Sequence, residues 1–261
     1  MCLIAIAYRA NPDFPLVLLA NRDEFYDRPT APLHFWDDHP GIAAGRDLDA
    51  GGTWLGVTRG GRFAALTNVR EPPPRVSGPR SRGDIVTDFL TSAQSPAVWL
   101  ASYRDQFDQF QGFNLLFGSL DEGLYFTSNR LGTLETVSPG VHGLSNGSLN
   151  DDWPKVRGLC EGLTRILATE TTLEAPRLQP LLVDRTQPED GNLPDTGVGL
   201  DLERLLAPRF IVSEGYGTRS SSIVIVNRGR EIRFSEYRYP QSGECSPPET
   251  SALDWQVPND I

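Results

Sequence analysis

Short apolar runs separated by turn-forming residues are the dominant pattern of the chain. Leu3–Ala7 and Leu16–Ala20 flank the turn-rich triplet at residues 11–13, so they predict a β-hairpin. Three further pairs of runs flank turns that contain glycine: Thr53–Thr58 with Phe63–Asn68, Phe113–Phe117 with Leu124–Thr127, and Ser221–Val226 with Glu231–Ser235. Four hairpins predict mainly antiparallel sheets.

Apolar residues at helical spacing predict a smaller number of helices. The clearest is Lys155–Ala168, in which five apolar side chains fall on one face. Ser95 is a candidate N-cap, with Pro96 in the first turn, for a helix over Ala97–Phe107. Shorter helices are predicted over Ile85–Leu90 and Leu200–Leu206. Because strands and helices do not alternate, the pattern favours an α+β fold with sheets covered by helices rather than a doubly wound parallel sheet.

Three segments show neither the pattern expected of strands nor the spacing expected of helices. Residues 71–79 are proline-rich and residues 187–197 are polar, so we expect irregular structure in both. Residues 241–261, which follow Pro240 and contain another pair of prolines, are predicted to form a loosely attached C-terminal tail. The sequence shows no linker within residues 1–240, which are therefore expected to form a single domain.

Composition excludes several classes of protein. Hydrophobic residues make up 39% of the chain and charged residues 22%, as in ordinary globular proteins, and no apolar run is long enough to span a membrane. A net charge of −10 without a concentrated basic tract argues against a nucleic-acid partner. Three cysteines and three histidines at wide spacing indicate neither a disulfide framework nor a metal site. We expect a cytoplasmic protein without a signal peptide or a metal cofactor; the sequence does not indicate its oligomeric state.

Cys2 is the first candidate for chemistry. Removal of Met1 would leave a residue that carries both a thiol, with a reference pKa of about 8.5, and an α-amine, with a reference pKa of about 7.7–8.0. That residue would supply nucleophile and base together. In the alternative interpretation, Cys2 is a small apolar side chain at the start of a buried strand.

A run of four polar residues, residues 21–24, follows the strand that pairs with the first one. The hairpin should bring this run close to Cys2. Because side chains alternate along a strand, Asn21 and Asp23 should share one face, with Arg22 and the next acid on the other. An aspartate beside an α-amine would orient it, and an arginine beside a thiol would stabilise the thiolate.

These residues belong to a larger set of motifs. Ala20-Asn21-Arg22-Asp23-Glu24-Phe25 with Arg28-Pro29, then Gly51-Gly52-Thr53-Trp54-Leu55-Gly56, then Ala65-Leu66-Thr67-Asn68 resemble the NRDE family, also called the transport-and-Golgi-organisation family. The resemblance extends over about residues 1–240. Eukaryotic members are associated with haem mobilisation and with lipid or acyl-CoA metabolism.

That family in turn resembles the choloylglycine and penicillin V acylase branch of the N-terminal-nucleophile (Ntn) hydrolases. The resemblance implies an αββα sandwich. The hairpin count and the amphipathic helices agree with it, and we expect Ala97–Phe107 and Lys155–Ala168 on the outer faces. The resemblance also implies catalytic roles for Cys2, Asp23, Asn68, Asn146 and Arg219.

The acylase motif has an arginine where this chain has Ala20, so whether Arg22, two residues further on, replaces it stays open. Asn68, Asn146 and Arg219 also have plain interpretations as turn or surface residues. Asp47 is expected in a solvated loop.

Three functions follow from these residues. The first is an amidohydrolase that cleaves a non-peptide C–N bond of a small-molecule substrate without a cofactor, with Asn21, Arg22, Arg28 and Trp54 contacting the substrate. An arginine, with Arg219 as the first choice, should lie near the sulfur. The second is a binding or trafficking protein for haem or a lipid or acyl ligand on the same fold. The third, a glutamine amidotransferase, matches only the Met-Cys start and the Asn146-Gly147 pair.

Overall fold

The protein is a sandwich of two antiparallel sheets. The computed structural model describes residues 2–72, 80–132, 134–240 and 248–258. The first sheet is built from β1 Cys2–Tyr8, β2 Leu16–Phe25, β10 Gly140–Leu144, β11 Tyr216–Val226, β12 Glu231–Arg238 and β13 Glu249–Gln256, in the order β10-β1-β2-β11-β12-β13. The second is built from β3 Thr30–Phe35, β4 Ile42–Asp47, β5 Leu55–Thr58, β6 Arg62–Asn68, β7 Phe113–Ser119, β8 Gly123–Ser128 and β9 Leu134–Thr136, in sequence order.

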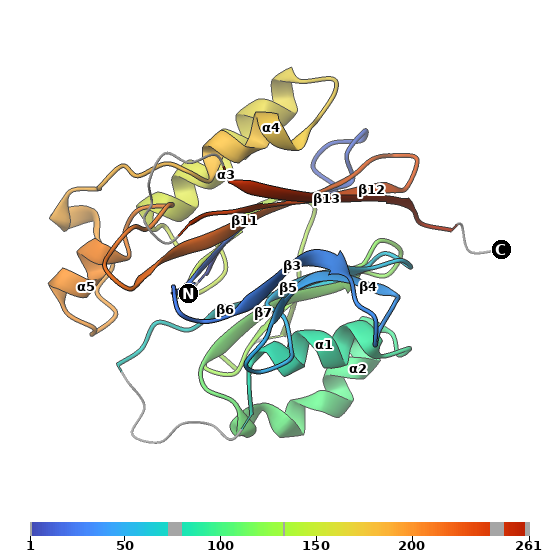
Figure 1. Ribbon diagram of the computed structural model, residues 1–261, viewed down its shortest axis with the longest axis horizontal. Coiled ribbons are helices and arrows are strands. Elements are labelled where there is room, and N and C mark those ends of the chain that lie inside the picture. Colours follow the sequence, from blue (N-terminus) through green and yellow to red (C-terminus); the bar gives the residue numbers. More distant parts are fainter. Residues whose placement is uncertain (1, 73–79, 133, 241–247, 259–261) are drawn as a thin grey trace.

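Helices cover the outer face of each sheet (Figure 1). The first sheet carries α3 Pro154–Thr169 and α4 Ala175–Leu178, and the second carries α1 Gly83–Thr91 and α2 Pro96–Tyr103. A shorter helix, α5 Leu200–Leu205, and the 3-10 turns Arg104–Gln109, Gln179–Leu181 and Asp190–Asn192 lie in the connections. The four-layer αββα architecture predicted from the sequence is confirmed.

Three apolar layers hold the sandwich together. The central layer packs the inner faces of the two sheets and includes Ile4, Ile6 and Leu18. A second layer lies between the first sheet and α3, and a third lies between the second sheet and helices α1 and α2. Strand alternation explains this division, because Leu3 and Leu19 project from the opposite face of the same hairpin and reach α3. The first hairpin is therefore buried on both faces.

The predicted hairpins are present, but several boundaries differ. β2 continues to Phe25, so the polar run at residues 21–24 lies inside a strand rather than after it. The helix predicted over Ala97–Phe107 ends at Tyr103 and continues as a 3-10 turn. Strands β3 and β4 were not predicted, because β3 contains a proline and β4 consists largely of small residues, so neither shows a clear alternation of apolar and polar side chains. Pairing of β3 with β4 and of β4 with β5 stabilises them as strands.

The prediction of a loosely attached tail is wrong for residues 249–256. These residues form β13, which pairs with β12 along its whole length. Trp255 is buried in the central layer, where its ring packs edge-on against Phe35 at 5.4 Å between centroids. Residues 241–247 of the expected tail and residues 73–79 of the expected irregular segment lie outside the described residues.

Candidate active site

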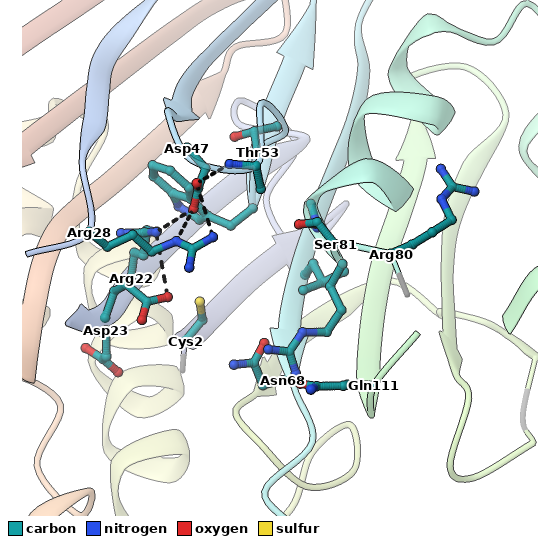
Figure 2. A pocket seen from close by; sticks show the side chains of 16 residues that line it. Cys2, Arg22, Asp23, Arg28, Asp47, Thr53, Asn68, Arg80, Ser81 and Gln111 are labelled. Carbon is teal, nitrogen blue, oxygen red and sulfur yellow. Dashed lines mark hydrogen bonds and ion pairs between the residues drawn. The ribbon is translucent and has the colours of Figure 1, made fainter. Parts of the chain in front are cut away.

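A cavity of about 350 Å³ opens where the first hairpin faces the end of β6 and the start of α1. Side chains from both sheets line it, so its walls exist only when the sandwich is assembled. Figure 2 shows the sulfur of Cys2 in the middle of this space, with Arg22, Arg28 and Asp47 on one side and Asn68 on the other.

Cys2 begins β1 and lies directly opposite Arg22 of β2. Its side chain projects from the inner face of the sheet, at the end of the row formed by Ile4 and Ile6, and the residue is 7% exposed. Burial raises the pKa of the thiol, and the Arg22 charge opposes that effect. The thiol is therefore protonated at neutral pH and needs a base to become a nucleophile.

Asp23 follows Arg22 and projects from the other face of β2, as the alternation predicts. It is buried, and its carboxylate accepts a hydrogen bond of 2.7 Å from Thr218 Oγ1. Burial raises the pKa of Asp23, whereas the Lys155 charge and the Thr218 hydrogen bond lower it. Since β1 and β2 are antiparallel and Cys2 pairs with Arg22, the backbone nitrogen of Cys2 points toward the level of Asp23.

Arg22 is held beside the sulfur by its neighbours. Its guanidinium stacks on Trp54, with 4.6 Å between the guanidinium carbon and the ring centroid, and Nη2 donates to Asp47 Oδ2 at 3.2 Å. Nη2 also lies 3.7 Å from Glu24 Oε2. The side chain is 6% exposed, and among the described residues its Nη1 atom has no hydrogen-bond partner. One N–H group of Arg22 is therefore buried without a partner in the described part of the chain.

Arg28 and Asp47 form the outer wall. Arg28 donates to Asp47 Oδ2 from Nε at 2.6 Å and to Oδ1 from Nη2 at 3.2 Å. Burial opposes ionisation of Asp47, but the hydrogen bonds from Arg28 and from a backbone amide outweigh it and lower the pKa of the carboxyl. Asp47 thus stays ionised in the cavity wall, rather than lying in the solvated loop that the sequence suggested.

Asn68 ends β6 and brings an amide side chain to the cavity from the second sheet. The segment after β10 fixes it there, because Asn146 Nδ2 donates to the Asn68 carbonyl at 2.9 Å. The neighbouring Ser145 donates to the Cys2 carbonyl at 3.3 Å, and its own carbonyl accepts from Thr67. One short segment therefore connects the strand of Cys2 to the strand of Asn68.

Three predicted site residues lie away from the cavity lining. Asn146 is fully buried behind Asn68 and lines the neighbouring cavity instead. The side chain of Asn21 faces α3 and donates to two backbone carbonyls, of Leu182 and Arg209. Both amides hold backbone in place, so neither is available to a ligand in the Cys2 cavity.

Arg219 is the third of these residues. The register between β2 and β11 shifts between Thr218 and Ser220, which leaves Arg219 in a bulge. Its Nη1 atom donates to the Phe25 carbonyl at 2.7 Å and to the Arg28 carbonyl at 3.1 Å. Among the described residues, the cations that line the cavity are Arg22, Arg28 and two residues near the start of α1.

Those two residues, Arg80 and Arg82, were missed by sequence reasoning. A close backbone approach brings them to the site: a Cβ atom at Gly52 would lie 2.6 Å from the carbonyl carbon of Gly83. Only glycine allows the turn at Gly51–Trp54 to lie against the first residue of α1 in this way. Nothing in the local sequence around Gly51 and Gly52 indicates that the start of α1 packs against them.

A cluster of buried charges lies on the other side of the first hairpin. Lys155, the single lysine of the chain, is 5% exposed and donates from Nζ to the Leu206 carbonyl at 2.9 Å. Burial lowers the pKa of Lys155 to about 7, and the Arg70 charge acts in the same direction. Arg70 forms a buried ion pair with Glu203 and packs over the ring of Trp153.

Comparison of the sequence with known proteins gives a consistent match. The family model described as Transport and Golgi organisation 2 matches residues 1–241. The Transport and Golgi organization protein 2 homolog of Homo sapiens is 33% identical over 258 residues, which is 90% of this chain and 92% of that protein. The Mus musculus homolog is 31% identical over the same length and shares of the two chains, and the Drosophila melanogaster protein is 28% identical over 267 residues, 90% of this chain and 91% of its own.

Comparison of the structure shows the fold. A cysteine-to-alanine mutant of conjugated bile acid hydrolase from Clostridium perfringens superposes with a TM-score of 0.53 at 6% identity, covering 97% of this chain and 92% of that chain. Another variant of the same hydrolase gives 0.51 at 7% identity, with the same coverage. The protein therefore has the same fold as that hydrolase. Within the described residues, no helix has the length and apolar character needed to cross a bilayer.

Proposed function

This chain belongs to the Transport and Golgi organisation 2 family, and we propose that it is a cysteine amidohydrolase whose nucleophile is Cys2 after removal of Met1. One observation carries the proposal: the Cys2 sulfur lies in a cavity that Asp23 and Asn68 also line, and these residues come from the strands that form the core of an Ntn-type sandwich. Cleavage of a non-peptide C–N bond is the reaction that this arrangement supports best.

The reaction starts with the thiol proton. The α-amine of Cys2 accepts it as the sulfur attacks the carbonyl carbon of the substrate, which forms the C–S bond. When the C–N bond breaks, the α-ammonium returns the proton to the leaving amine. A water molecule then attacks the thioester, and the release of the carboxylic acid restores the thiol.

The surrounding residues orient the α-amine, stabilise the thiolate and bind the oxyanion. Asp23 is the proposed group that binds and orients the α-amine, and the register between β1 and β2, which puts the nitrogen of Cys2 at the level of Asp23, supports this role. The positive charge of Arg22 favours the thiolate over the thiol. Asn68 is the donor for the oxyanion that develops on the substrate carbonyl, and Asn146 supports it as a positioning residue.

A carrier function is the second candidate, and the naming of the relatives for transport and Golgi organisation favours it. In a carrier of haem or of a lipid or acyl ligand, the Cys2 thiol takes no part in bond cleavage. Burial, which raises the pKa of this thiol, is compatible with that role. The two candidates differ in whether Cys2 becomes acylated.

Acylation can be tested with p-nitrophenyl acetate as the probe. Intact-mass measurement first establishes that Met1 is absent. The hydrolase should then release a burst of p-nitrophenol equal to the protein concentration and carry an acetyl group on Cys2. Cys2→Ala should abolish the burst, whereas Cys160→Ala, which changes a half-buried thiol on α3, should retain it. A protein with a free N-terminal Cys2 that shows neither burst nor adduct would exclude the hydrolase and leave the carrier.

A further inference from the structure

The charges that line the Cys2 cavity are unequally compensated. Within the described residues the lining contains four arginines, at positions 22, 28, 80 and 82, and three acids, at positions 23, 24 and 47. Arg28 is paired with Asp47, and Arg80 is paired outside the lining with Asp84 and Asp88. Arg22 is itself paired with Asp47 and Glu24, so Arg82 is the lining arginine that has no ion-pair partner among the described residues.

Arg82 has no acidic partner in the described part of the chain. Among those residues its one hydrogen bond is from Nη1 to the Gly112 carbonyl at 3.2 Å, and none of their carboxylates forms an ion pair with it. Burial lowers the pKa of its guanidinium, and this effect outweighs the opposing charges, which include those of Glu24 and Glu71. A partly buried guanidinium of this kind is stabilised when an anion binds.

Arg22 has an N–H group without a hydrogen-bond partner among the described residues. Its side chain is more than nine-tenths buried, and its Nη1 atom has no partner among the described residues although Nη2 is engaged by Asp47. Guanidinium groups bind carboxylate and phosphate oxygens through paired N–H donors. Trp54 and Leu66 supply an apolar surface in the same cavity. The lining thus combines an apolar wall, the guanidinium groups of Arg22 and Arg82, and the sulfur of Cys2 in one cavity.

We propose that the substrate cleaved at Cys2 is an acyl compound that carries a carboxylate or phosphate group close to the scissile bond, bound between Arg82 and Arg22. This inference rests on the proposed function and adds the substrate class to it. A cavity of about 350 Å³ is at the small end of ligand pockets, so the anionic group and the reacting carbonyl belong to one compact molecule.

A pair of alkylating reagents of nearly equal size tests the proposal without knowledge of the substrate. Iodoacetate is anionic and iodoacetamide is neutral. The rate of each at Cys2, followed by peptide mass spectrometry, is divided by its rate with free cysteine. An anion site at Arg82 and Arg22 should raise the ratio for iodoacetate over that for iodoacetamide about tenfold, which corresponds to about 1.4 kcal/mol.

Variants separate anion binding from stabilisation of the thiolate. Arg82→Gln should lower the iodoacetate rate about tenfold and leave the iodoacetamide rate within about twofold, because only one reagent carries the charge. Arg82→Lys should retain part of the preference, and Arg165→Gln, on the exposed side of α3, should retain all of it. Thermal unfolding of each variant establishes that it is folded.

Inorganic phosphate and acetate, added separately, should protect Cys2 from iodoacetamide, and the more protective ion identifies the anionic group that the site prefers.

Equal normalised rates for the two reagents in the native protein would overturn the anion site while leaving a reactive Cys2. A parallel fall of both rates in Arg82→Gln would assign Arg82 to the thiolate alone. Failure of the proposed function has a different signature, since p-nitrophenyl acetate would then leave no acetyl group on Cys2.

Discussion

Lys155→Met should change how the stability of this protein depends on pH. The ammonium of Lys155 lies beneath the first hairpin, where its one described hydrogen bond goes to the Leu206 carbonyl. Burial and the nearby Arg70 charge lower its pKa from 10.5 to about 7, so the folded protein holds this proton less tightly than the unfolded chain. Methionine has a similar length and no charge, so the variant removes this titration and leaves the packing close to the original.

The sign and size follow from proton linkage. Below pH 7 Lys155 is protonated in both states and contributes no slope. Between pH 7 and about 10.5 the unfolded chain binds more protons than the folded chain, so the free energy of unfolding rises with pH. Each pH unit in that window is worth about 1.4 kcal/mol, and the two units from pH 7 to pH 9 give about 3 kcal/mol.

The assay is urea unfolding of both proteins at pH 6, 7, 8 and 9 in a Cys2→Ala background, which removes the titration of the neighbouring thiol. The free energy of unfolding of the lysine protein, minus that of Lys155→Met, should increase by about 3 kcal/mol from pH 6 to pH 9. A difference that is independent of pH would show that Lys155 keeps its proton throughout this range. The reasoning from burial would then be refuted.

Three other changes should have defined effects. Asn68→Ala should slow acylation of Cys2 by p-nitrophenyl acetate about 10²–10³-fold, because it removes an oxyanion donor; an unchanged burst rate would exclude that role. Trp255→Ala should lower the free energy of unfolding by about 3–5 kcal/mol, since the ring fills the central layer, and a loss below about 1 kcal/mol would contradict the attachment of β13. Glu203→Gln should cost about 3–5 kcal/mol in denaturant unfolding because it leaves the Arg70 guanidinium buried without its counter-charge, and a neutral result would show that Arg70 is compensated elsewhere.

The sequence predicted those parts of the site that depend on local spacing. The short connection of the first hairpin brings β2 back beside β1, and alternation along β2 places Arg22 and Asp23 on opposite faces. Those two facts are sufficient to place both residues around Cys2. Asn68 followed from the family resemblance, and its place at the end of β6 faces the same cavity.

The remaining parts depend on tertiary contacts that no local pattern contains. Arg82 reaches the cavity because Gly83, the first residue of α1, packs against Gly52 in the turn before β5. The two glycines are far apart in the sequence. Arg219 lies in a bulge, which changes the direction of its side chain, and no sequence pattern predicts this bulge. Trp255 was placed in a tail because of the prolines before it, although its burial is what attaches β13.

The burial of Lys155 also determines how the protein responds to amine-directed chemistry. Every other basic side chain in the sequence is an arginine or a histidine, so the surface presents no ε-amino group. Succinimidyl esters, aldehydes and acetyl donors, which consume accessible lysines on most proteins, would find the α-amine as their principal target. Amine-directed labels and cross-linkers would therefore attach at a single point, and the extent of their reaction would report the accessibility of the chain's amino terminus.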